Sequence, residues 1–338
     1  MSNQPPIEVP QGAIRLNTDS QKLEFFAEDR WYQFATDTPV LDGGARGLAC
    51  GGNAPTHSNG IEFITIATLG NAIDFADLSR LTRDQGATGS RTRAVNGGGQ
   101  APGPANTNVI DATDFASRSN AVDIADLTVA RRNMTATGSQ TRGIFAAGQT
   151  PTLQDVIDYM TIQSTANAVD FGNLTTANKS ASAVSSPTRA LIAEGLSPAT
   201  AVNTIDFITI STTGNAQDFG DLTVARYAVG TVSSSTRAVF MNGTRTSPSL
   251  TGTNIMDFVT MNTLGNAVDF GDGTQSQVSN AQTASSCVRG VRMGGVGPSV
   301  DGHMDYINIA TKAHAEDFGT LTTFRIEGAG CSNAHGGL

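Results

Sequence analysis

The chain has few charged residues, few aromatic residues and no long hydrophobic run. Of its 338 residues, 15% are charged and 6% aromatic. No segment approaches the roughly 20 consecutive apolar residues of a membrane-spanning helix. The first residues, MSNQPPIEVPQG, lack the basic and apolar regions of a signal peptide. We therefore expect synthesis in a cytoplasm, no export by the secretory route and no membrane insertion.

Charge and cysteine content exclude several further classes of protein. The net charge is -9, and the sequence has no basic stripe of the kind that binds nucleic acid. Cys50, Cys287 and Cys331 are too few and too scattered for a disulfide framework or a zinc site. The four histidines show no metal-ligand spacing, and no catalytic serine motif is present. We expect no catalytic residue, no metal and no cofactor.

Small and β-branched residues dominate what remains. The chain has 37 glycines and many Ser, Thr and Asn residues, whereas Val, Ile, Thr and Phe supply most of the apolar content. These residue types are enriched in strands and turns. The composition predicts an all-β protein with almost no helix.

The tripeptide Asp218-Phe219-Gly220 matches a magnesium-binding motif of protein kinases, but it recurs along the chain. The other kinase motifs are absent. Copies or close variants begin at Asp74, Asp123, Asp170, Asp269 and Asp317, separated by 47 to 51 residues. The motif therefore marks six copies of an internal repeat of about 48 residues.

Each repeat contains segments typical of four antiparallel strands. An alternating apolar run such as IDFITI begins ten residues before the Asn of each NAxD segment, or before His314 in the last copy. A strand opened by Arg and ended by Gly begins 19 or 20 residues after the motif Asp in five copies. Six such units predict a six-bladed β-propeller over residues 41–338. Paired glycines and unit length resemble kelch repeats, although the kelch Tyr and Trp positions are not matched. A β-solenoid is the alternative.

The two ends of the repeat region complement one another. The first Arg strand, RGLACGG from Arg46, has no preceding partner, and the chain stops where a further Arg strand would begin. We predict that 328–332 pairs with 46–51 and closes the ring. This places Cys50 and Cys331 in neighbouring strands, where a disulfide is an open alternative to free thiols.

Twelve acids belong to the repeat itself, one in each IDF-type run and one in each NAxD segment. We expect these acids to form hydrogen bonds within hairpins and to contact arginines within and between blades. Calcium sites are the weaker alternative, because calcium ligands normally cluster in one short loop.

The spacing between the repeat Arg and the next IDF-type run varies from 15 to 19 residues, so insertions collect in one loop. Six such loops are expected at one end of the ring, where recognition or simple spacing are both plausible roles. The candidate binding residues in these loops are His57, Asn59, Asn106, Gln154, Asn203, Arg245, Asn254, Asp301 and His303.

Residues 1–40 do not follow the repeat. They predict three short strands, 13–17, 22–27 and 30–34, which form a β-meander for attachment or oligomerisation. The candidate anchoring residues are Ile14, Leu16, Leu23, Phe25, Trp31 and Tyr32.

This segment resembles a short module of bacteriophage tail-fibre, neck and other virion proteins. The matching positions are Gly12, Ile14, Arg15, Asn17, Leu23, Glu24, Phe25 and Trp31. The downstream repeats also resemble repeats of predicted phage structural proteins. The resemblance implies a non-enzymatic virion component, made in a host cytoplasm and assembled as a homo-oligomer. Residues 1–40 would contact other virion proteins, and the propeller would bind a host-surface glycan or protein. A purely structural decoration or adaptor, and a cellular kelch-type lectin or interaction module, are the alternatives.

Overall fold

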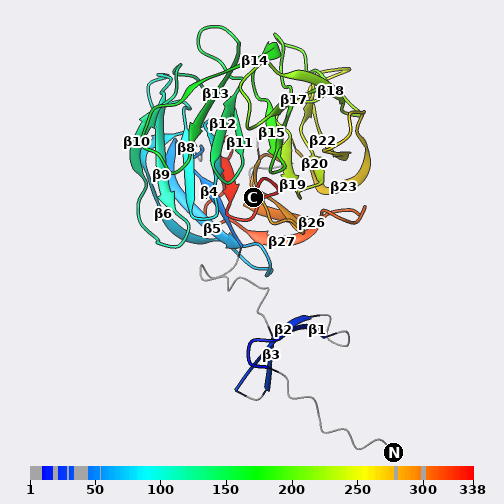
Figure 1. The fold of residues 1–338 in the computed structure, drawn as a ribbon. Coiled ribbons are helices and arrows are strands. Elements are labelled where there is room, and N and C mark those ends of the chain that lie inside the picture. The colour runs from blue at the N-terminus through cyan, green and yellow to red at the C-terminus, as the bar shows by residue number, and fades with distance from the viewer. Residues whose placement is uncertain are drawn as a thin grey trace, which may run out of the picture. The chain divides into compact units, whose positions relative to one another are not determined.

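The structure is a computed structural model that describes residues 10–17, 22–28, 30–33, 45–53, 55–277, 281–297 and 302–338, with the backbone alone at 17, 22, 23, 33 and 277. The chain divides into two compact units, Met1–Leu41 and Asp42–Leu338. Every regular element in the described residues is a β-strand, which confirms the all-β prediction (Figure 1). None of the described segments is a helix of the length and apolarity needed to cross a membrane.

The first unit contains a three-stranded antiparallel sheet in the order β1-β2-β3. Its strands are β1 (Ile14–Asn17), β2 (Lys22–Ala27) and β3 (Arg30–Gln33). Ile14 lies opposite Phe25, which in turn lies opposite Tyr32. Because side chains alternate across a strand, these three residues share one face of the sheet.

In the second unit, the described residues form six antiparallel sheets, each with a four-stranded path. In chain order the first sheet is β28 (Ala329–Ser332), β4 (Arg46–Cys50), β5 (Ser58–Thr65) and β6 (Ile73–Thr82). The second is β7 (Gly86–Gly89), β8 (Arg93–Gly97), β9 (Val109–Asp114) and β10 (Val122–Asp126). The third is β11 (Thr135–Gly138), β12 (Arg142–Ala146), β13 (Gln154–Thr161) and β14 (Val169–Asn178).

The fourth sheet is β15 (Ser182–Ser185), β16 (Arg189–Ala193), β17 (Thr204–Thr209) and β18 (Gln217–Asp221). The fifth is β19 (Gly230–Ser233), β20 (Arg237–Met241), β22 (Thr251–Thr260) and β23 (Val268–Gln277), with the short β21 (Thr244–Arg245) also paired to β22. The sixth is β24 (Gln282–Ser285), β25 (Arg289–Met293), β26 (His303–Asn308) and β27 (Glu316–Thr320).

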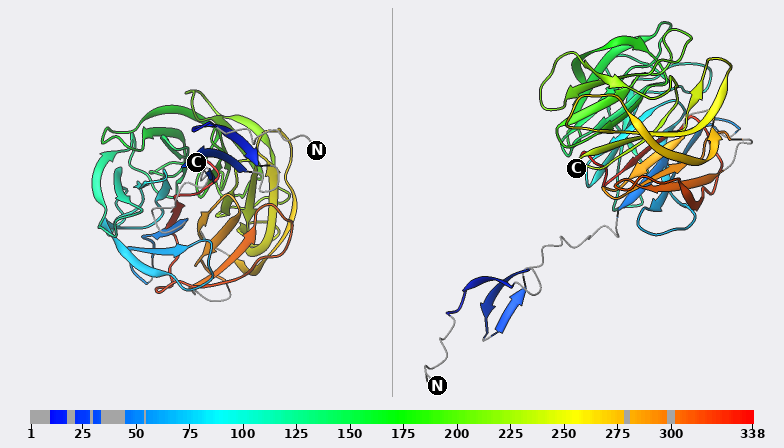
Figure 2. Two further views of the ribbon diagram at one scale, coloured as in Figure 1. Left: turned by 60° about the horizontal axis from the view of Figure 1, so that its bottom comes forward. Right: turned by 90° about the vertical axis from the view of Figure 1, so that its right-hand side faces the viewer.

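The sheets of the second unit surround a common centre, with the first strand of each sheet innermost (Figure 2). Strand β7 contacts β11, and the contacts continue through β15, β19, β24 and β28 back to β7. Within the first sheet, the C-terminal strand β28 pairs with β4, so that Ala329 lies opposite Cys50. This arrangement is consistent with the β-propeller class.

The hydrophobic core is divided into clusters that lie between consecutive sheets. Phe219 of the fourth sheet, for example, packs with Phe240 of the fifth. Phe219 also makes an edge-to-face contact with Phe207 of its own sheet, with ring centroids 6.2 Å apart. Another cluster joins Phe318 of the sixth sheet to Ile64 of the first. Since burial of one large apolar side chain contributes roughly 1.5–3 kcal/mol, these clusters bind each sheet to both neighbours.

The repeated GNAxDFGD sequence joins each sheet to the next. In the fourth sheet, the Gly214 N–H donates to the Phe171 carbonyl of the third, at 2.8 Å. The Asn215 side chain accepts from the backbone N–H of Asn173. Equivalent side-chain acceptors serve every other junction, including that between the sixth and first sheets: Asn71, Asn120, Asn167, Asn266 and His314.

The Gly of the DFG tripeptide permits an especially close approach in four repeats, whereas Ala76 and Ala125 take this position in the other two. At Gly172 the φ angle is +146°, and a Cβ atom would lie 2.5 Å from the Gly214 carbonyl oxygen. Real Cβ atoms do not approach an oxygen so closely, and side-chain-bearing residues rarely adopt this backbone conformation. The DFG motif is thus a site of contact between sheets.

The repeat arginines form a second set of links. The Arg189 guanidinium donates to the Met261 carbonyl of the next sheet at 2.8 Å and lies over the Phe207 ring at 4.6 Å. The other strand-opening arginines likewise donate to a carbonyl of the following sheet: Arg46, Arg93, Arg142, Arg237 and Arg289. Arg289 donates to Ile66, so these links also join the sixth sheet to the first.

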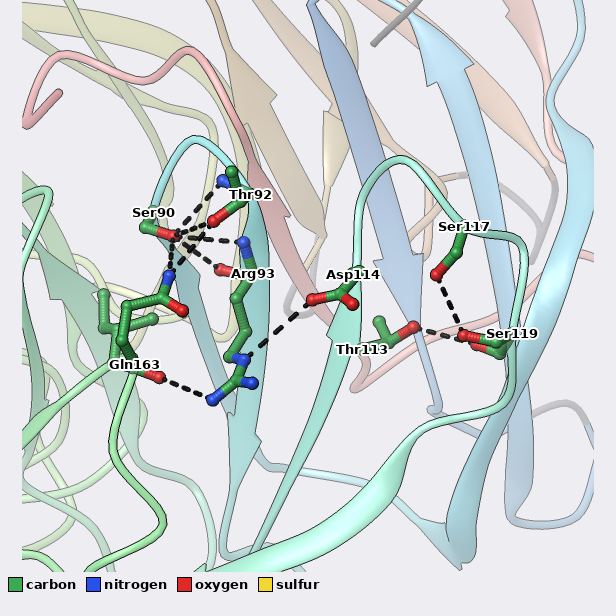
Figure 3. Close-up of polar contacts among 9 residues, drawn as sticks. Ser90, Thr92, Arg93, Thr113, Asp114, Ser117, Ser119 and Gln163 are labelled. Carbon is green, nitrogen blue, oxygen red and sulfur yellow. Dashed lines mark hydrogen bonds and ion pairs between the residues drawn. The ribbon is translucent and has the colours of Figure 1, made fainter.

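The second sheet departs from this pattern. The position of the aromatic ring is held by Ala112, which lies opposite Val95. Figure 3 shows Arg93 beside Asp114, 3.9 Å from its carboxylate, and beside Gln163. The Gln163 amide donates to the hydroxyls of Ser90 and Thr92. A polar cluster therefore replaces the arginine–aromatic contact in this sheet.

Candidate functional site: the loop face and the central cavity

The repeat acids separate into a buried set and an exposed set. The acids of the IDF-type strands are buried, and each accepts hydrogen bonds from Ser or Thr after the fourth strand of the preceding sheet or at its end. Asp257, for example, accepts from Thr223 and forms an ion pair with the buried Arg226 at 2.9 Å. The NAxD acids, such as Asp218, are exposed. Among the described residues, no ion pair joins an NAxD acid to an arginine, so the expected arginine contacts are found for the buried set. Asp218 makes the expected local hydrogen bond, accepting from the Gly220 N–H at 3.0 Å.

The arginines that pair with the buried acids are not the arginines that open the second strands. Arg131, Arg226 and Arg325 hold Asp158, Asp257 and Glu62. Arg80 holds Asp111, and Arg292 holds Asp305 from the adjacent strand of the same sheet. For Arg131, Arg226 and Arg325 a signal was present in the sequence, because each follows the Thr of a DLT or TLT tripeptide by three residues.

The fourth sheet has no arginine at this place in the described structure. Asp206 instead shares a hydrogen bond with the buried Glu194, and both carboxyls bind the Thr175 hydroxyl. The position of Arg131 and Arg226 is taken by Asn178. Burial, followed by the neighbouring Asp206, raises the pKa of Glu194 to about 7. Burial also raises the pKa of Asp206.

The variable loops lie on the same side as the segments that lead from the fourth strand of one sheet to the first strand of the next. We call these connecting segments the links. Five loops begin with a residue that forms a β-bridge to a link. These bridges join Asn53 to Ile326, Gln100 to Arg83, Gln149 to Arg132, Leu196 to Lys179 and Thr244 to Tyr227. We call this side, formed by the five loops and the five links, the loop face.

Several residues expected in loops instead belong to strands. Asn59 is in β5, Gln154 begins β13, Arg245 ends β21, Asn254 is in β22 and His303 begins β26. For Asn59, Gln154 and Asn254 the reason is that the fourth strand extends in their three sheets and gives the third strand additional partners, whereas His303 pairs with Thr320 and Arg245 with Thr251. Ser58 lies opposite Thr82, Gln154 opposite Asn178 and Thr253 opposite Gln277.

The predicted loop residues make local contacts and do not form one cluster. Asn106 donates to the Gln149 carbonyl of the next loop, and the Asn203 carbonyl accepts from Leu222. The His303 ring contacts the Thr274 hydroxyl at 2.9 Å. Partial burial and the positive charge of Arg83 lower the pKa of His57, against an opposing effect of Glu327. Asp301 lies outside the described residues.

A cavity of about 120 Å³ lies along the innermost strands. Residues of all six sheets line it, and most contribute a hydroxyl group or a small apolar group. Its hydroxyl-bearing residues include Thr135, Ser182, Thr231 and Thr283. His335, which follows β28, also contacts the cavity and binds the Gly89 carbonyl at 2.8 Å. Burial lowers the pKa of the His335 imidazole.

The links form a ring of strained residues where this cavity meets the loop face. Asp84 lines the cavity with φ of 58°, and the equivalent residues of other links also have left-handed backbone conformations: Asn133, Ser180, Ala228 and Glu327. Backbone hydrogen bonds join members of this ring, such as Ser180 N–H to the Asn133 carbonyl at 2.8 Å. We call this ring the mouth of the cavity. The hydrogen bonds stabilise a conformation that non-glycine residues otherwise adopt rarely.

Charge at the mouth is uneven. The residue before each ring member is Arg83, Arg132 or Lys179 in three successive links, but Tyr227 or Ile326 in two others. Burial and the Glu327 carboxylate raise the pKa of Asp84 to about 7, in spite of the three cations. These cations were not among the residues selected from the sequence, where their equivalence appears only after alignment of the links.

In the first unit, two of the predicted anchoring residues are strongly exposed. Ile14 is 64% and Leu16 62% exposed, on the face that also carries Phe25 and Tyr32. Phe25 and Tyr32 stack with ring centroids 5.4 Å apart. Trp31 lies on the other face, under the Arg15 guanidinium at 4.0 Å. The side chain of Leu23 lies outside the described residues.

In this structure Cys50 and Cys331 are buried free thiols, with no disulfide between them. They lie on neighbouring strands, and the hydrogen bond that the Cys331 thiol donates to Cys50, together with burial, raises the pKa of Cys331. Cys287 is also free, but it is exposed.

Comparison of the chain with protein-family models and with curated protein sequences finds no match.

Proposed function

We propose that the second unit is a closed six-bladed β-propeller with kelch-like repeats. Four features support it: the cyclic order of the innermost strands, the pairing of β28 with β4, the core cluster between the sixth and first sheets, and the Arg289 link to Ile66. A closed ring pairs the first and last strands of the repeat region and leaves only the short outer edge of each sheet unpaired. It therefore suits a rigid unit that displays loops.

We further propose that the chain is a non-enzymatic structural protein of a bacteriophage particle, of the tail-fibre, neck or baseplate type. Its first unit attaches the chain to other virion proteins or to further copies of the chain, and its propeller binds a host-surface glycan or protein. The observation that carries this proposal is the exposed apolar face of the small first sheet. Three short strands bury little surface on their own, so a face with Ile14 and Leu16 exposed suits a contact with another protein.

Incorporation of variants into particles tests this attachment. Ile14→Asp and Leu16→Asp place charges on the exposed face without removing a buried side chain. We expect the double variant to be lost from purified particles while its second unit stays folded. Val122→Asp, at an aliphatic residue that is 61% exposed in the second unit, is the matched control. Normal incorporation of the double variant, or loss of both proteins alike, contradicts attachment through this face.

An adhesion assay distinguishes a host-binding role from a purely structural role. The correctly assembled protein should adhere to susceptible cells and compete with infection. Absence of adhesion favours a decoration or adaptor that acts only within the particle. Absence of the chain from particles, with glycan binding retained, favours a cellular lectin.

A further inference from the structure

We propose that the mouth of the cavity binds the anionic groups of an acidic polysaccharide, with Arg132 and Lys179 as the principal cations and Arg83 as a third. This inference rests on the proposed function, in which the propeller binds a surface glycan, and it specifies the chemistry of that glycan and the place where it binds.

The three cations gather at one part of the mouth because they occupy equivalent positions in successive links. Each lies directly before a left-handed residue of the ring, and each forms a β-bridge with the start of a loop. Tyr227 and Ile326 take this position in two other links. In a chain with a net charge of -9, this is a local concentration of positive charge.

Two of the three cations are not neutralised by an ion pair. Arg83 binds the Glu327 carboxylate at 2.8 Å and the Gln100 amide oxygen. Lys179 donates to the neutral Gln149 amide oxygen at 3.0 Å. Among the described residues, no carboxylate lies within ion-pairing distance of Arg132 or Lys179. A carboxylate, sulfate or phosphate group can therefore bind them without first displacing an acid.

The surroundings of the cations suit a sugar. The cavity lined by Asp84 contains the hydroxyl oxygens of Thr135 and Ser182 and the unpartnered amide oxygen of Gln85, which can accept from ring hydroxyls. The Ser182 hydroxyl and the Gln85 amide N–H already donate to backbone carbonyls. A volume of about 120 Å³ is too small for a chain of sugar rings. The polysaccharide would thus cross the mouth and place one acidic substituent within it.

Asp84 makes this binding dependent on pH. Its carboxyl faces Arg83, Arg132, Lys179 and Glu327, and it accepts a hydrogen bond from Asn133. With a pKa of about 7, it changes from neutral to negative across the neutral range. A bound anion repels the ionised carboxylate, so affinity should increase as pH falls from 8 to 6. The pKa of the nearby His57 is lowered, so in this range the imidazole changes charge less than an ordinary histidine.

Calorimetric titration of the full chain with defined polysaccharides tests the proposal. The probes are polygalacturonate, which carries carboxylates, heparin, which carries sulfates, and dextran, which is neutral. We expect binding of at least one acidic probe, no binding of dextran, and weaker binding at higher salt. Arg132→Gln with Lys179→Gln should reduce affinity at least tenfold. Arg91→Gln is the matched control. Arg91 is an exposed cation in the turn after β7, whereas Arg83 lies before the start of that strand.

The outcomes distinguish this inference from the proposed function. Adhesion to cells without binding of either acidic probe overturns the inference and leaves the proposed function intact. An equal loss on Arg91→Gln, or equal binding of duplex DNA at the same residues, shows a general charge effect and also overturns it. Binding of an acidic probe without adhesion overturns the host-binding role alone. Asp84→Asn should remove most of the increase in affinity between pH 8 and pH 6.

Discussion

Glu194 and Asp206 share a hydrogen bond in the fourth sheet, whereas in the third and fifth sheets the acid equivalent to Asp206 pairs with an arginine, Arg131 or Arg226. The pair has a direct consequence for stability. The folded state binds a proton that the unfolded state releases above the ordinary pKa of Glu, near 4.3. This contribution is fully present at low pH and is lost as pH rises through about 7.

The free energy of unfolding should therefore fall between pH 5 and pH 8. One pH unit between the folded and unfolded pKa corresponds to about 1.4 kcal/mol, so Glu194 accounts for a loss of about 3 kcal/mol or less. Glu194→Gln should reduce the slope, measured by urea denaturation across this range. Asp84, whose pKa is also about 7, contributes in the same direction. An unchanged slope in the double variant Glu194→Gln, Asp84→Asn would contradict this assignment.

Asn178→Arg restores the residue found at this position in three other links, as Arg131, Arg226 and Arg325. We expect the new guanidinium to lower the pKa values of both carboxyls and to stabilise the protein at pH 8 more than at pH 5. Glu194→Ala, combined with Asn178→Arg, reproduces the arrangement of Arg131, Asp158 and Ala147 and serves as the matched variant. Greater destabilisation at pH 8 than at pH 5 would show that the site cannot accept the larger side chain.

The arginines that open the second strand of each sheet should differ in how much they stabilise the protein. Arg189→Ala removes both a carbonyl contact and the Phe207 stacking contact, whereas Arg93→Ala removes a carbonyl contact without aromatic stacking. We expect a loss of about 1.5–3 kcal/mol for Arg189→Ala. The loss for Arg93→Ala should be smaller by about 0.5–1 kcal/mol, the contribution of a cation–aromatic contact. Equal losses of unfolding free energy, measured by chemical denaturation, would indicate that the aromatic ring adds no stability.

Gly220→Ala should destabilise the protein strongly. A Cβ atom at Gly220 would lie 2.6 Å from the Gly265 carbonyl of the next sheet, and the φ angle is +145°. Gly214→Ala has a similar φ of +156° but no atom within 4 Å of its Cβ. The melting temperature of Gly220→Ala should fall further than that of Gly214→Ala, because only the first substitution adds a clash to the backbone strain. Similar values for both would place the whole cost in the backbone conformation.

The three thiols should react at different rates with a thiol reagent. Cys287 is exposed, whereas Cys50 and Cys331 are buried. The native protein should react at one thiol and the unfolded protein at three. A single reactive thiol in the unfolded protein would reveal a disulfide between Cys50 and Cys331.

Local patterns allowed much of the second unit to be predicted. The alternation of apolar residues and the constant spacing of the motif Asp defined the strands, because both follow from backbone geometry within one repeat. The three strands of the first unit were predicted for the same reason. Strand lengths were less well predicted, because the extensions of β6, β14 and β23 depend on partners beyond the repeat pattern.

The sequence by itself determined the all-β class and the internal repeat, since these follow from composition and period. Only the tertiary structure decided which arginine pairs with which acid, that Glu194 takes the place of an arginine beside Asp206, and that Arg132 and Lys179 lie near Asp84 of the cavity. These relationships join residues of different repeats. Their distances and pKa values depend on how consecutive sheets pack, which no single repeat specifies.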